Sequence, residues 1–452
     1  MNDDSSTLPG GGVTRQAVHT VAVRSVTLIV RFALVVAITK TLPPGEYGAY
    51  ALIMAIHALG IYIAGLNLFT YVYRTVPALR PEEQLRVFKT TVVVEAAVSL
   101  LLVTVFLAAG GLSPALRYFN VAAYESTFAL GLFLLVPLVC VAEINYFFLA
   151  QGRIERANWV DFLGQAAWAL PLLALRAGGM VITVPLLLWG QIGGAVAVAI
   201  YASRHIDLGR WWRTRVDWSV LRTGVLFSLP LMLPAIGEYS LRLADRLVLA
   251  HFHSAADVGV YSFAAVFVNT IYSFTAGVVC GAFGPRIFAA HNGDARERRD
   301  VLQSYMLKIS LSCFLIAFTL LWLGIGPLVD ILARPEYRAA ASLIPIMGIS
   351  MMLLVIAYPA NFMLMLRNRV LLIAAIDLTG MALGLAVNLA LVPRFSYYGA
   401  AVGSVIGLSM TTVLKYWLSG VHKHLQPAVL WSIAEERLVL QQWLRRVRQV
   451  FA

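Results

Sequence analysis

Residues 31–50 read RFALVVAITKTLPPGEYGAY, and residues 242–261 read RLADRLVLAHFHSAADVGVY. Aligned without a gap, the two stretches match at these positions: Arg31 with Arg242, Glu46 with Asp257, Gly48 with Gly259, and Tyr50 with Tyr261. A second set keeps its internal spacing: Arg153, Asp161 and Gly164 recur as Arg369, Asp377 and Gly380. Because charged residues, tyrosine and glycine carry the match, we infer that the chain is duplicated. In a duplicated membrane transporter the pathway commonly lies between the halves.

The composition places these halves in a membrane. Hydrophobic residues make up 60% of the 452 residues and charged residues 13%, whereas soluble domains average about 45–50% and about 25%. The apolar residues form long blocks between short charged loops, which predicts about twelve membrane-spanning helices. Residues 47–74, 159–175, 370–392 and 399–418 are each predicted as one span. The expected fold is an all-α polytopic membrane protein with two duplicated bundles of about six helices around a central cavity.

The net charge of +12 reflects orientation in the membrane. Basic residues gather in alternate loops, notably between residues 204 and 222 and between residues 296 and 299. The positive-inside rule therefore predicts that both termini are cytoplasmic. The expected organisation is a cytoplasmic tail, an N-terminal bundle, a basic linker, a C-terminal bundle and a basic amphipathic tail: residues 1–18, 19–203, 204–220, 221–420 and 421–452. The last segment is expected to lie on the anionic leaflet, or otherwise to bind a partner.

Several function classes are excluded by what the sequence lacks. It has neither a phosphate-binding loop of the G-x-x-x-x-G-K-[ST] type nor an H-E-x-x-H metal motif. Its three cysteines lie within apolar blocks and suggest neither a disulfide framework nor a metal site. Its internal loops are too short for a separate catalytic domain. We therefore expect a protein that is not an enzyme and that has no cofactor, no metal and no nucleic-acid partner.

Two arginines within the first span carry the strongest functional signal. Arg24 and Arg31 are seven residues apart, so they lie on one face of a helix. A charge near the bilayer centre costs about 2.5–3.5 kcal/mol on insertion scales. It therefore needs a wet cavity, a partner, or a route to the headgroups. Arg31 lies nearer the middle of the span and is predicted to face a cavity, whereas Arg24 could instead reach the membrane surface.

The seventh span holds an acid–base cluster of its own. Glu238 and Arg242 are four residues apart, Arg242 and Asp245 are three apart, and Arg246 follows. One interpretation is a self-neutralising ladder. The other is that Arg242 and Arg31 face a common anionic ligand with Arg246 beside them. Glu238 or Asp245 would then hold Arg242, or bind H⁺ or Na⁺ during transport. Guanidinium suits phosphate because it donates two hydrogen bonds and stays charged.

Other intramembrane residues leave more than one interpretation open. Pro230 and Pro234 should bend the seventh span, and the bend is either static or a gating hinge. Glu95 and Glu143 either line the pathway or hydrogen-bond between helices. Asp377 is expected to have a structural role near the cytoplasmic end of its span.

At this point the chain resembles the Wzx-type polysaccharide flippases of the multidrug/oligosaccharidyl-lipid/polysaccharide (MOP) exporter superfamily. The residues that carry the resemblance are LPPGEYGAYAL from residue 42, FLAQGR from residue 148, DRLVLAHFHSAADVGVYSFA from residue 245, and LALVPRFSYYGAAVGSVIG from residue 389. The resemblance implies the MATE-like fold and a bacterial inner-membrane location. It also implies transport of an undecaprenyl-diphosphate-linked oligosaccharide, such as an O-antigen, capsule or exopolysaccharide unit. By position, Arg31 and Arg242 would hold the diphosphate, with Arg24 and Arg246 beside them. Polysaccharide polymerase and co-polymerase proteins would be further partners.

Three alternatives remain open at this point. A cation-coupled multidrug exporter shares the fold, but a cationic drug favours a cavity dominated by carboxylates. A lipid II flippase would also use arginines to bind an anionic lipid headgroup, but such proteins usually carry two further helices. A membrane-embedded glycan polymerase or glycosyltransferase usually carries a large periplasmic loop, which this sequence lacks.

Overall fold

The computed structural model describes residues 10–431. Within that range the described side chains exclude those of residues 10–18 and of Val21, Pro234, Glu238, Leu241, Arg242, Val278, Gly281, Pro285 and Asn292. All regular elements of the described range are helices. The predicted tail over residues 432–452 lies outside the described residues.

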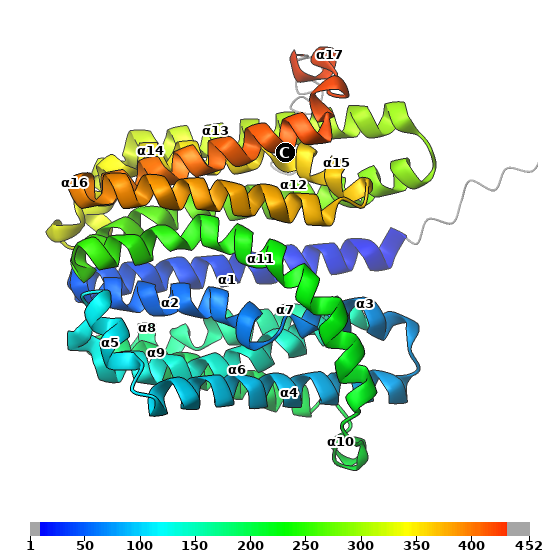
Figure 1. Cartoon of the computed structure of the whole chain (residues 1–452), viewed down its shortest axis with the longest axis horizontal. Coiled ribbons are helices and arrows are strands. Elements are labelled where there is room, and N and C mark those ends of the chain that lie inside the picture. The colour runs from blue at the N-terminus through cyan, green and yellow to red at the C-terminus, as the bar shows by residue number, and fades with distance from the viewer. Residues whose placement is uncertain (1–9, 432–452) are drawn as a thin grey trace, which may run out of the picture.

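Two bundles of helices lie side by side along the long axis of the molecule (Figure 1). The N-terminal bundle contains α1 (Gly10–Thr41), α2 (Pro44–Ala64), α3 (Leu68–Thr75), α4 (Pro81–Ala108), α5 (Leu112–Tyr118), α6 (Glu125–Ala150), α7 (Ile154–Phe162), α8 (Ala169–Ala177) and α9 (Val184–Ser203). A short linker helix α10 (Leu208–Arg213) leads to the second bundle. This contains α11 (Trp218–Phe252), α12 (Ala255–Asn292), α13 (Arg296–Leu332), α14 (Ala340–Ile356), α15 (Tyr358–Leu366) and α16 (Val370–Ser419), followed by α17 (Pro427–Trp431).

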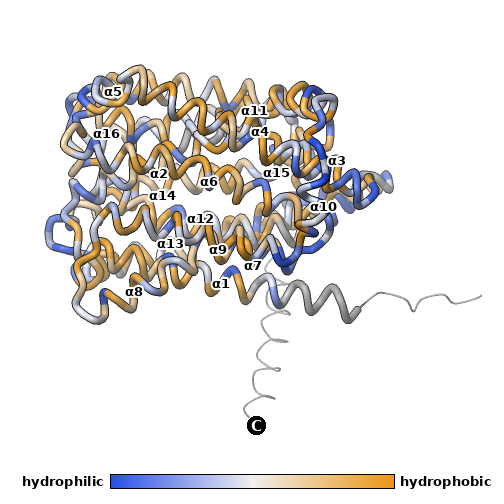
Figure 2. The backbone as a smooth tube through the Cα atoms, turned by 90° about the horizontal axis from the view of Figure 1, so that it is seen from below, coloured by the Kyte–Doolittle hydropathy of each residue, from blue (hydrophilic) through white to orange (hydrophobic). Residues whose placement is uncertain are grey.

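The hydropathy of the surface matches a membrane protein. Hydrophobic residues follow the middle of the helices, and hydrophilic residues gather at the loops of both ends (Figure 2). Ten helical segments of the described range are long and apolar enough to cross a membrane. Two further spans bring this number to the predicted twelve. One arises because the last segment, residues 370–419, is a hairpin of two spans, and the other is residues 154–177, which are divided into shorter helices.

The hairpin is α16, which holds two antiparallel spans. Its 50 residues would extend about 75 Å as one straight helix, which is far more than a bilayer. Ser396 breaks it with φ 49° and ψ −132°. Glycines allow the two arms to pack closely: a Cβ on Gly403 would lie 1.9 Å from Oδ1 of Asn388, and one on Gly380 would lie 1.9 Å from Oγ1 of Thr411. The two predicted spans thus form one tight pair.

The predictions of residues 47–74 and 159–175 as uninterrupted spans are wrong. The first span breaks between α2 and α3, where Leu66 and Asn67 take left-handed φ values of 50° and 54°. The second is split into α7, a π-helical turn at Leu163–Ala167, and α8. Hydropathy reports only how apolar a segment is, so neither interruption could be found from it.

The two halves meet where the sequence repeat places its matched glycines. A Cβ on Gly48 of α2 would lie 1.8 Å from the carbonyl oxygen of Ala255, and one on Gly259 of α12 would lie 2.0 Å from that of Pro44. Pro44 and Ala255 also correspond in the repeat. The contact is therefore reciprocal, as a pseudo-twofold axis requires. Glycine is needed at both positions because the backbones touch. The predicted duplication of the bundles is confirmed.

Further contacts join the bundles at this same end of the molecule. The hydroxyl of Thr39 donates to the carbonyl oxygen of Leu332 at 3.2 Å. The backbone N–H of Arg334 donates to the carbonyl oxygen of Thr39 at 3.1 Å. Tyr337 donates to the carbonyl oxygen of Leu42 at 3.2 Å. The Arg334 guanidinium also donates to Glu336 at 2.7 Å. This end, called here the sealed end, fastens the bundles together.

Candidate functional site

The polar centre of the N-terminal bundle is built around Arg31. This side chain is exposed although it lies within the first span. Its guanidinium donates to Oε1 of Gln165 at 3.0 Å, and Gln165 donates to Oδ1 of Asp161 at 2.8 Å. Asp161 and Gln165 share a helix face because they are four residues apart. Arg31 is thus linked to a carboxylate through an amide and keeps part of its guanidinium exposed.

Two further groups extend this centre. Arg24 is exposed and, like Arg31, acts electrostatically on Asp161. Tyr50 of α2 also feels the charge of Arg31, and its hydroxyl accepts a hydrogen bond from Gln191 of α9 at 3.0 Å. Two cations and one carboxylate leave the group with net positive charge. An anionic headgroup could be held there by hydrogen bonds from guanidinium.

The polar centre of the C-terminal bundle differs because it is buried. Asp245 is 5% exposed and accepts hydrogen bonds from Tyr261 and, at 3.1 Å, from Ser404. Arg246 is 8% exposed, donates from Nε to Ser262 at 3.1 Å, and lies 6.0 Å from the centre of the Tyr261 ring. In this conformation Arg246 is packed among the helices. It does not lie on an exposed wall of the kind that Arg31 occupies.

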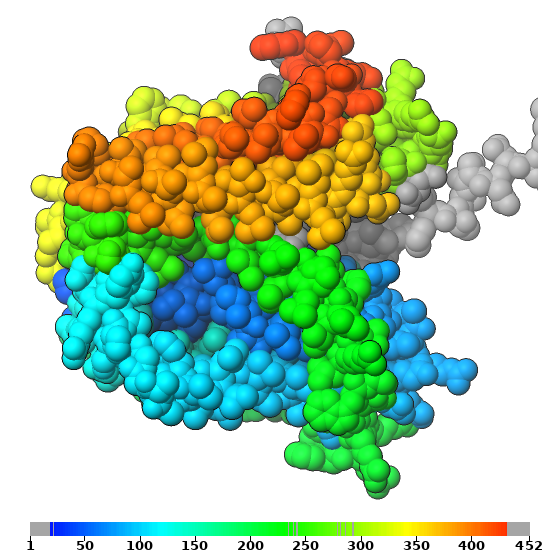
Figure 3. All heavy atoms as spheres, in the orientation of Figure 1, coloured from blue at the N-terminus to red at the C-terminus, as the bar shows by residue number. Residues whose placement is uncertain are grey.

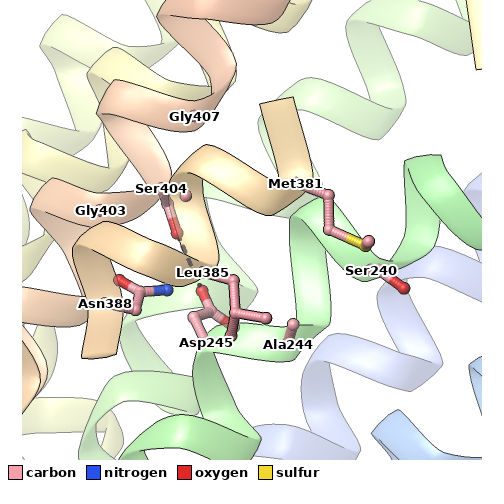
Figure 4. A pocket seen from close by; sticks show the side chains of 10 residues that line it. Ser240, Ala244, Asp245, Met381, Leu385, Asn388, Gly403, Ser404 and Gly407 are labelled. Carbon is pink, nitrogen blue, oxygen red and sulfur yellow. Dashed lines mark hydrogen bonds between the residues drawn. The ribbon is translucent and has the colours of Figure 1, made fainter. Parts of the chain in front are cut away.

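A small polar pocket opens beside Asp245, between α11 and the two arms of α16. It holds about 20 Å³ and is lined by Ser240, Ala244, Asp245, Met381, Gly384, Leu385, Asn388, Gly403, Ser404 and Gly407. Figure 4 shows the hydroxyl of Ser404 and the amide nitrogen of Asn388 directed toward Asp245, with the amide oxygen of Asn388 directed away. This buried Oδ1 has no hydrogen-bond partner among the described residues. The space suits one water molecule or one small cation, which the carboxylate and hydroxyl oxygens could ligate.

The remaining predicted site residues lie on α11. Glu238, Arg242 and Pro234 fall within this helix, but their side chains lie outside the described residues. Pro230 is exposed. Figure 1 shows α11 bent, with its first half turning away toward α10 and the N-terminal bundle, as expected for a helix with two prolines. Gating at this bend remains a prediction.

Asp377 has the structural role expected of it, with a partner that sequence reasoning did not identify. Its carboxylate lies 2.7 Å from Nζ of Lys415, and each side chain is 5% exposed. The pair joins the two arms of α16. Lys415 could have been noticed as a cation inside a predicted span, since such a residue needs an acidic partner.

An apolar pocket of about 210 Å³ lies on another face of the N-terminal bundle. It is lined by side chains of α2, α4, α5, α6 and α11, among them Leu52, Phe106, Leu116, Phe128 and Leu247. Figure 3 shows this face hollowed between α11 and the α4–α6 region, with α2 at its floor. The side chains that line the pocket offer only apolar contacts.

Both the sequence and the fold of this chain match known proteins. Residues 37–332 match the family described as polysaccharide biosynthesis protein. The chain belongs to this family. No curated protein matches it closely enough to be named as a relative. The predicted resemblance to polysaccharide flippases of the MOP superfamily is confirmed at the level of family and fold.

Solved structures with the same fold include transporters and a flippase. An inward-facing MATE-family multidrug transporter of the MOP superfamily has a TM-score of 0.72 and 14% identity, over 88% of this chain and 95% of that one. The lipid II flippase MurJ, in an inward closed conformation, has a TM-score of 0.73 and 10% identity, over 95% and 92%. A MOP superfamily transporter from Pyrococcus furiosus has a TM-score of 0.58 and 12% identity, over 92% and 94%. At such identities the likeness shows the fold alone.

For this member of the family, sequence reasoning missed the residues that connect the charges. Gln165 and Gln191 are uncharged and gave no signal within apolar sequence. Tyr50 and Tyr261 were matched in the repeat, and each now lies at the polar centre of its own bundle. That match was the available clue. Among the described residues no group of three or more His, Cys, Asp or Glu could hold a metal ion.

Proposed function

We propose that this protein is a flippase that moves an undecaprenyl-diphosphate-linked oligosaccharide from the cytoplasmic to the periplasmic leaflet of a bacterial inner membrane. The observation that carries the proposal is the exposed, cationic Arg31 centre within the spans of a polysaccharide biosynthesis family member. Arg31 and Arg24 would bind the diphosphate, and Arg242 would approach it from the second bundle. Polysaccharide polymerase and co-polymerase proteins would receive the product.

The physical need agrees with this assignment. A glycan headgroup carries many hydroxyls, and each one left without a partner in hydrocarbon costs free energy. A polar route between the bundles removes that cost, while the polyprenyl tail stays in lipid. The tail could rest against apolar surface such as the 210 Å³ pocket.

The direction of opening fits alternating access. The sealed end fastens the bundles through Gly48, Gly259 and the contacts of Thr39 and Tyr337. With both termini cytoplasmic, this end would be periplasmic and the cavity would open to the cytoplasm. The higher TM-score with the inward-facing transporter, 0.72, than with an outward-facing one, 0.59, agrees. Opposing rotation of the bundles about the glycine contact would expose the site to the other side.

Coupling to H⁺ or Na⁺ would use the pocket beside Asp245. A cation bound there would neutralise the Asp245 carboxylate, and it would lie between α11 and α16, which both line the pocket. Because α11 also carries Arg242, occupancy of the pocket could be felt at the substrate site. Glu238, one turn from Arg242 on α11, is the other coupling candidate.

Proteoliposomes test the substrate class directly. We expect the purified protein to translocate a fluorescent undecaprenyl-diphosphate-linked glycan, measured as the fraction that becomes accessible to an impermeant quencher. Lipid II and a cationic dye are the competing substrates, and Arg31→Ala is the inactive control. Transport of the dye alone would refute the proposal in favour of multidrug export. Transport of lipid II alone would assign the protein to cell-wall synthesis.

A further inference from the structure

Two glutamates are buried together in the N-terminal bundle, away from the Arg31 centre. Glu95 of α4 and Glu143 of α6 are both 0% exposed. Thr91 donates its hydroxyl to Oε1 of Glu143. By distance and angle, neither carboxylate oxygen of Glu95, nor Oε2 of Glu143, has a hydrogen-bond partner of good geometry among the described residues. The backbone N–H of Leu68, at the start of α3, is the polar group that acts on Glu95. The hydroxyl of Ser99, one turn beyond Glu95, is buried and unpartnered as well.

The charges that act on the pair are all acidic. Glu143 and the thiol of Cys140 are the titratable groups that act on Glu95. Lys89 is the nearest cation along α4, but its ammonium donates to the carbonyl oxygen of Trp211 at 2.7 Å. His57 of α2 lies in the same bundle with Nε2 2.7 Å from the carbonyl oxygen of Gly131. Other titratable side chains on the surrounding helices include Glu46, Tyr47, Tyr50 and Tyr62 of α2, Tyr71, Tyr73 and Arg74 of α3, Glu82, Glu83 and Arg86 of α4, Glu125 and Tyr146 of α6, Glu155, Arg156 and Asp161 of α7, and Arg222 and Tyr239 of α11.

Such a pair cannot carry two negative charges. Glu143 acts electrostatically on Glu95, and two neighbouring like charges repel strongly in a medium of low dielectric. Burial without a cation adds a desolvation cost for each ionised carboxylate. A proton on one carboxyl removes the repulsion and converts one unpartnered oxygen into a donor that the other carboxyl can accept. The physical chemistry therefore asks for at least one bound proton.

The pair also lies against the interruption of the second span. A Cβ on Gly65 would lie 3.4 Å from Oε1 of Glu95. Immediately beyond Gly65, Leu66 and Asn67 are both left-handed, a conformation that is unfavourable for residues with a Cβ. Interrupted helices are a recurring way to build ion sites at the centre of membrane transporters.

We propose that Glu95 and Glu143 form a proton-binding site whose occupancy sets the geometry of the α2–α3 break. On protonation, one carboxylate oxygen forms an O–H bond with a proton from solvent, and the charge of the pair falls by one. Ionisation would drive the two carboxylates apart and move α3 relative to α6. The inference deepens the proposed function, on which it rests for its role in transport, by giving the N-terminal bundle a proton site distinct from the Asp245 pocket.

Movement of α3 would reach the second bundle through direct contacts. A Cβ on Gly224 of α11 would lie 3.0 Å from the ring of Tyr71 of α3. Just before the break, the hydroxyl of Tyr62 donates to that of Tyr239 of α11 at 3.2 Å. The proton site is therefore one helix away from the bent helix that carries Arg242 and Asp245.

Infrared spectroscopy of the purified full-length protein tests proton binding without any substrate. We expect the wild type at about pH 7, where an exposed carboxyl is ionised, to show the carbonyl stretch of a protonated buried carboxylic acid. Glu95→Gln with Glu143→Gln should remove that band. Because other acids are buried, the difference spectrum against the matched control Glu125→Gln is the measurement. Glu125 is on the same helix as Glu143 but exposed, so its loss should leave the band unchanged.

Hydrogen exchange tests the link to the break. Amide exchange at residues 65–70 should change between about pH 6 and about pH 9 in the wild type, after correction for the intrinsic rate, but not in the double variant. If the double variant fails to fold, each single variant replaces it, since Gln keeps the shape and the Thr91 contact. A band of unchanged size in the folded double variant would overturn the proposal. For the single variants the exchange response decides, because the remaining buried carboxyl can keep its own proton, and a response identical to that of the wild type in both would overturn the proposal. If both tests give the expected results but the wild type does not transport the glycan, the proton site stands and the proposed function is rejected.

Discussion

Replacing Arg31 separates substrate binding from stability. In the structure its guanidinium is exposed and bonded to the neutral amide of Gln165, and Gln165 keeps its own bond to Asp161. Arg31→Ala therefore leaves no carboxylate stripped of a direct ion pair. By analogy with exposed ion pairs, the loss of stability should stay near about 1 kcal/mol or less. A directly paired, buried arginine would instead cost about 3–5 kcal/mol.

The effect on transport should be much larger. Hydrogen bonds to charged groups are worth about 1.5–3 kcal/mol each. Loss of a two-pronged contact to a diphosphate, worth about 3 kcal/mol, corresponds to a fall of about a hundredfold. Arg31→Lys keeps the charge but loses the fork, so a fall of about tenfold is expected. The assay is quencher-detected flipping of a fluorescent lipid-linked glycan, with apparent melting temperature measured on the same preparations. Arg117→Ala removes an exposed arginine of α5 and serves as the control.

Two outcomes would refute a role for Arg31 in binding the diphosphate. Normal flipping by a stably folded Arg31→Ala protein would refute the diphosphate contact. A marked loss of thermal stability, recovered when Asp161 is also replaced by Asn, would show instead that the arginine is a structural counter-charge.

Three other predictions test the architecture. A cysteine within residues 210–216 should react with an impermeant reagent only from the cytoplasmic side, and labelling of intact cells would invert the topology. Gly48→Ala should weaken closure of the sealed end, because its Cβ would lie 1.8 Å from a carbonyl oxygen of α12. Reduced cross-linking across that end is the readout, and Gly193→Ala, which has open space, is the control. Lys415→Met should destabilise the protein by about 3–5 kcal/mol, and adding Asp377→Leu should recover much of the loss; equal melting temperatures would exclude a stabilising pair.

How far the sequence predicts this fold depends on which physical signal is read. Long apolar blocks are sufficient for the all-helical membrane class, since the bilayer leaves few other solutions. The repeat matched Gly48 with Gly259 in sequence, and the structure gives the reason for the match, because each glycine accommodates a carbonyl oxygen of the opposite half. The breaks at Leu66 and at the π-helical turn Leu163–Ala167 had no counterpart in hydropathy, which averages over the window in which they occur.

The site was predicted in part for a similar reason. A charged residue inside a span is conspicuous, so Arg31 and Asp245 could be singled out. Their partners were less visible, because Gln165, Ser404 and Tyr261 are neutral and their importance comes only from what they contact across helices. The sequence placed Asp245 beside Arg242 on the same helix. In the structure its hydrogen bonds to other helices run from α11 to Tyr261 of α12 and Ser404 of α16.

The matched tyrosines show how a duplicated scaffold can support two different tasks. Tyr50 and Tyr261 correspond in the repeat, and each lies at a polar centre. In the N-terminal bundle the centre is an exposed cation, suited to an anionic headgroup. In the C-terminal bundle it is a carboxylate that is 5% exposed beside a pocket of about 20 Å³, which is too small for a headgroup but large enough for an ion. Because the bundles touch at the pseudo-twofold glycine contact, a change in one centre that tilts its bundle must alter the opening at the other. The symmetric backbone thus permits coupling between the two bundles. The different side chains at the two polar centres determine which ligand each centre can bind.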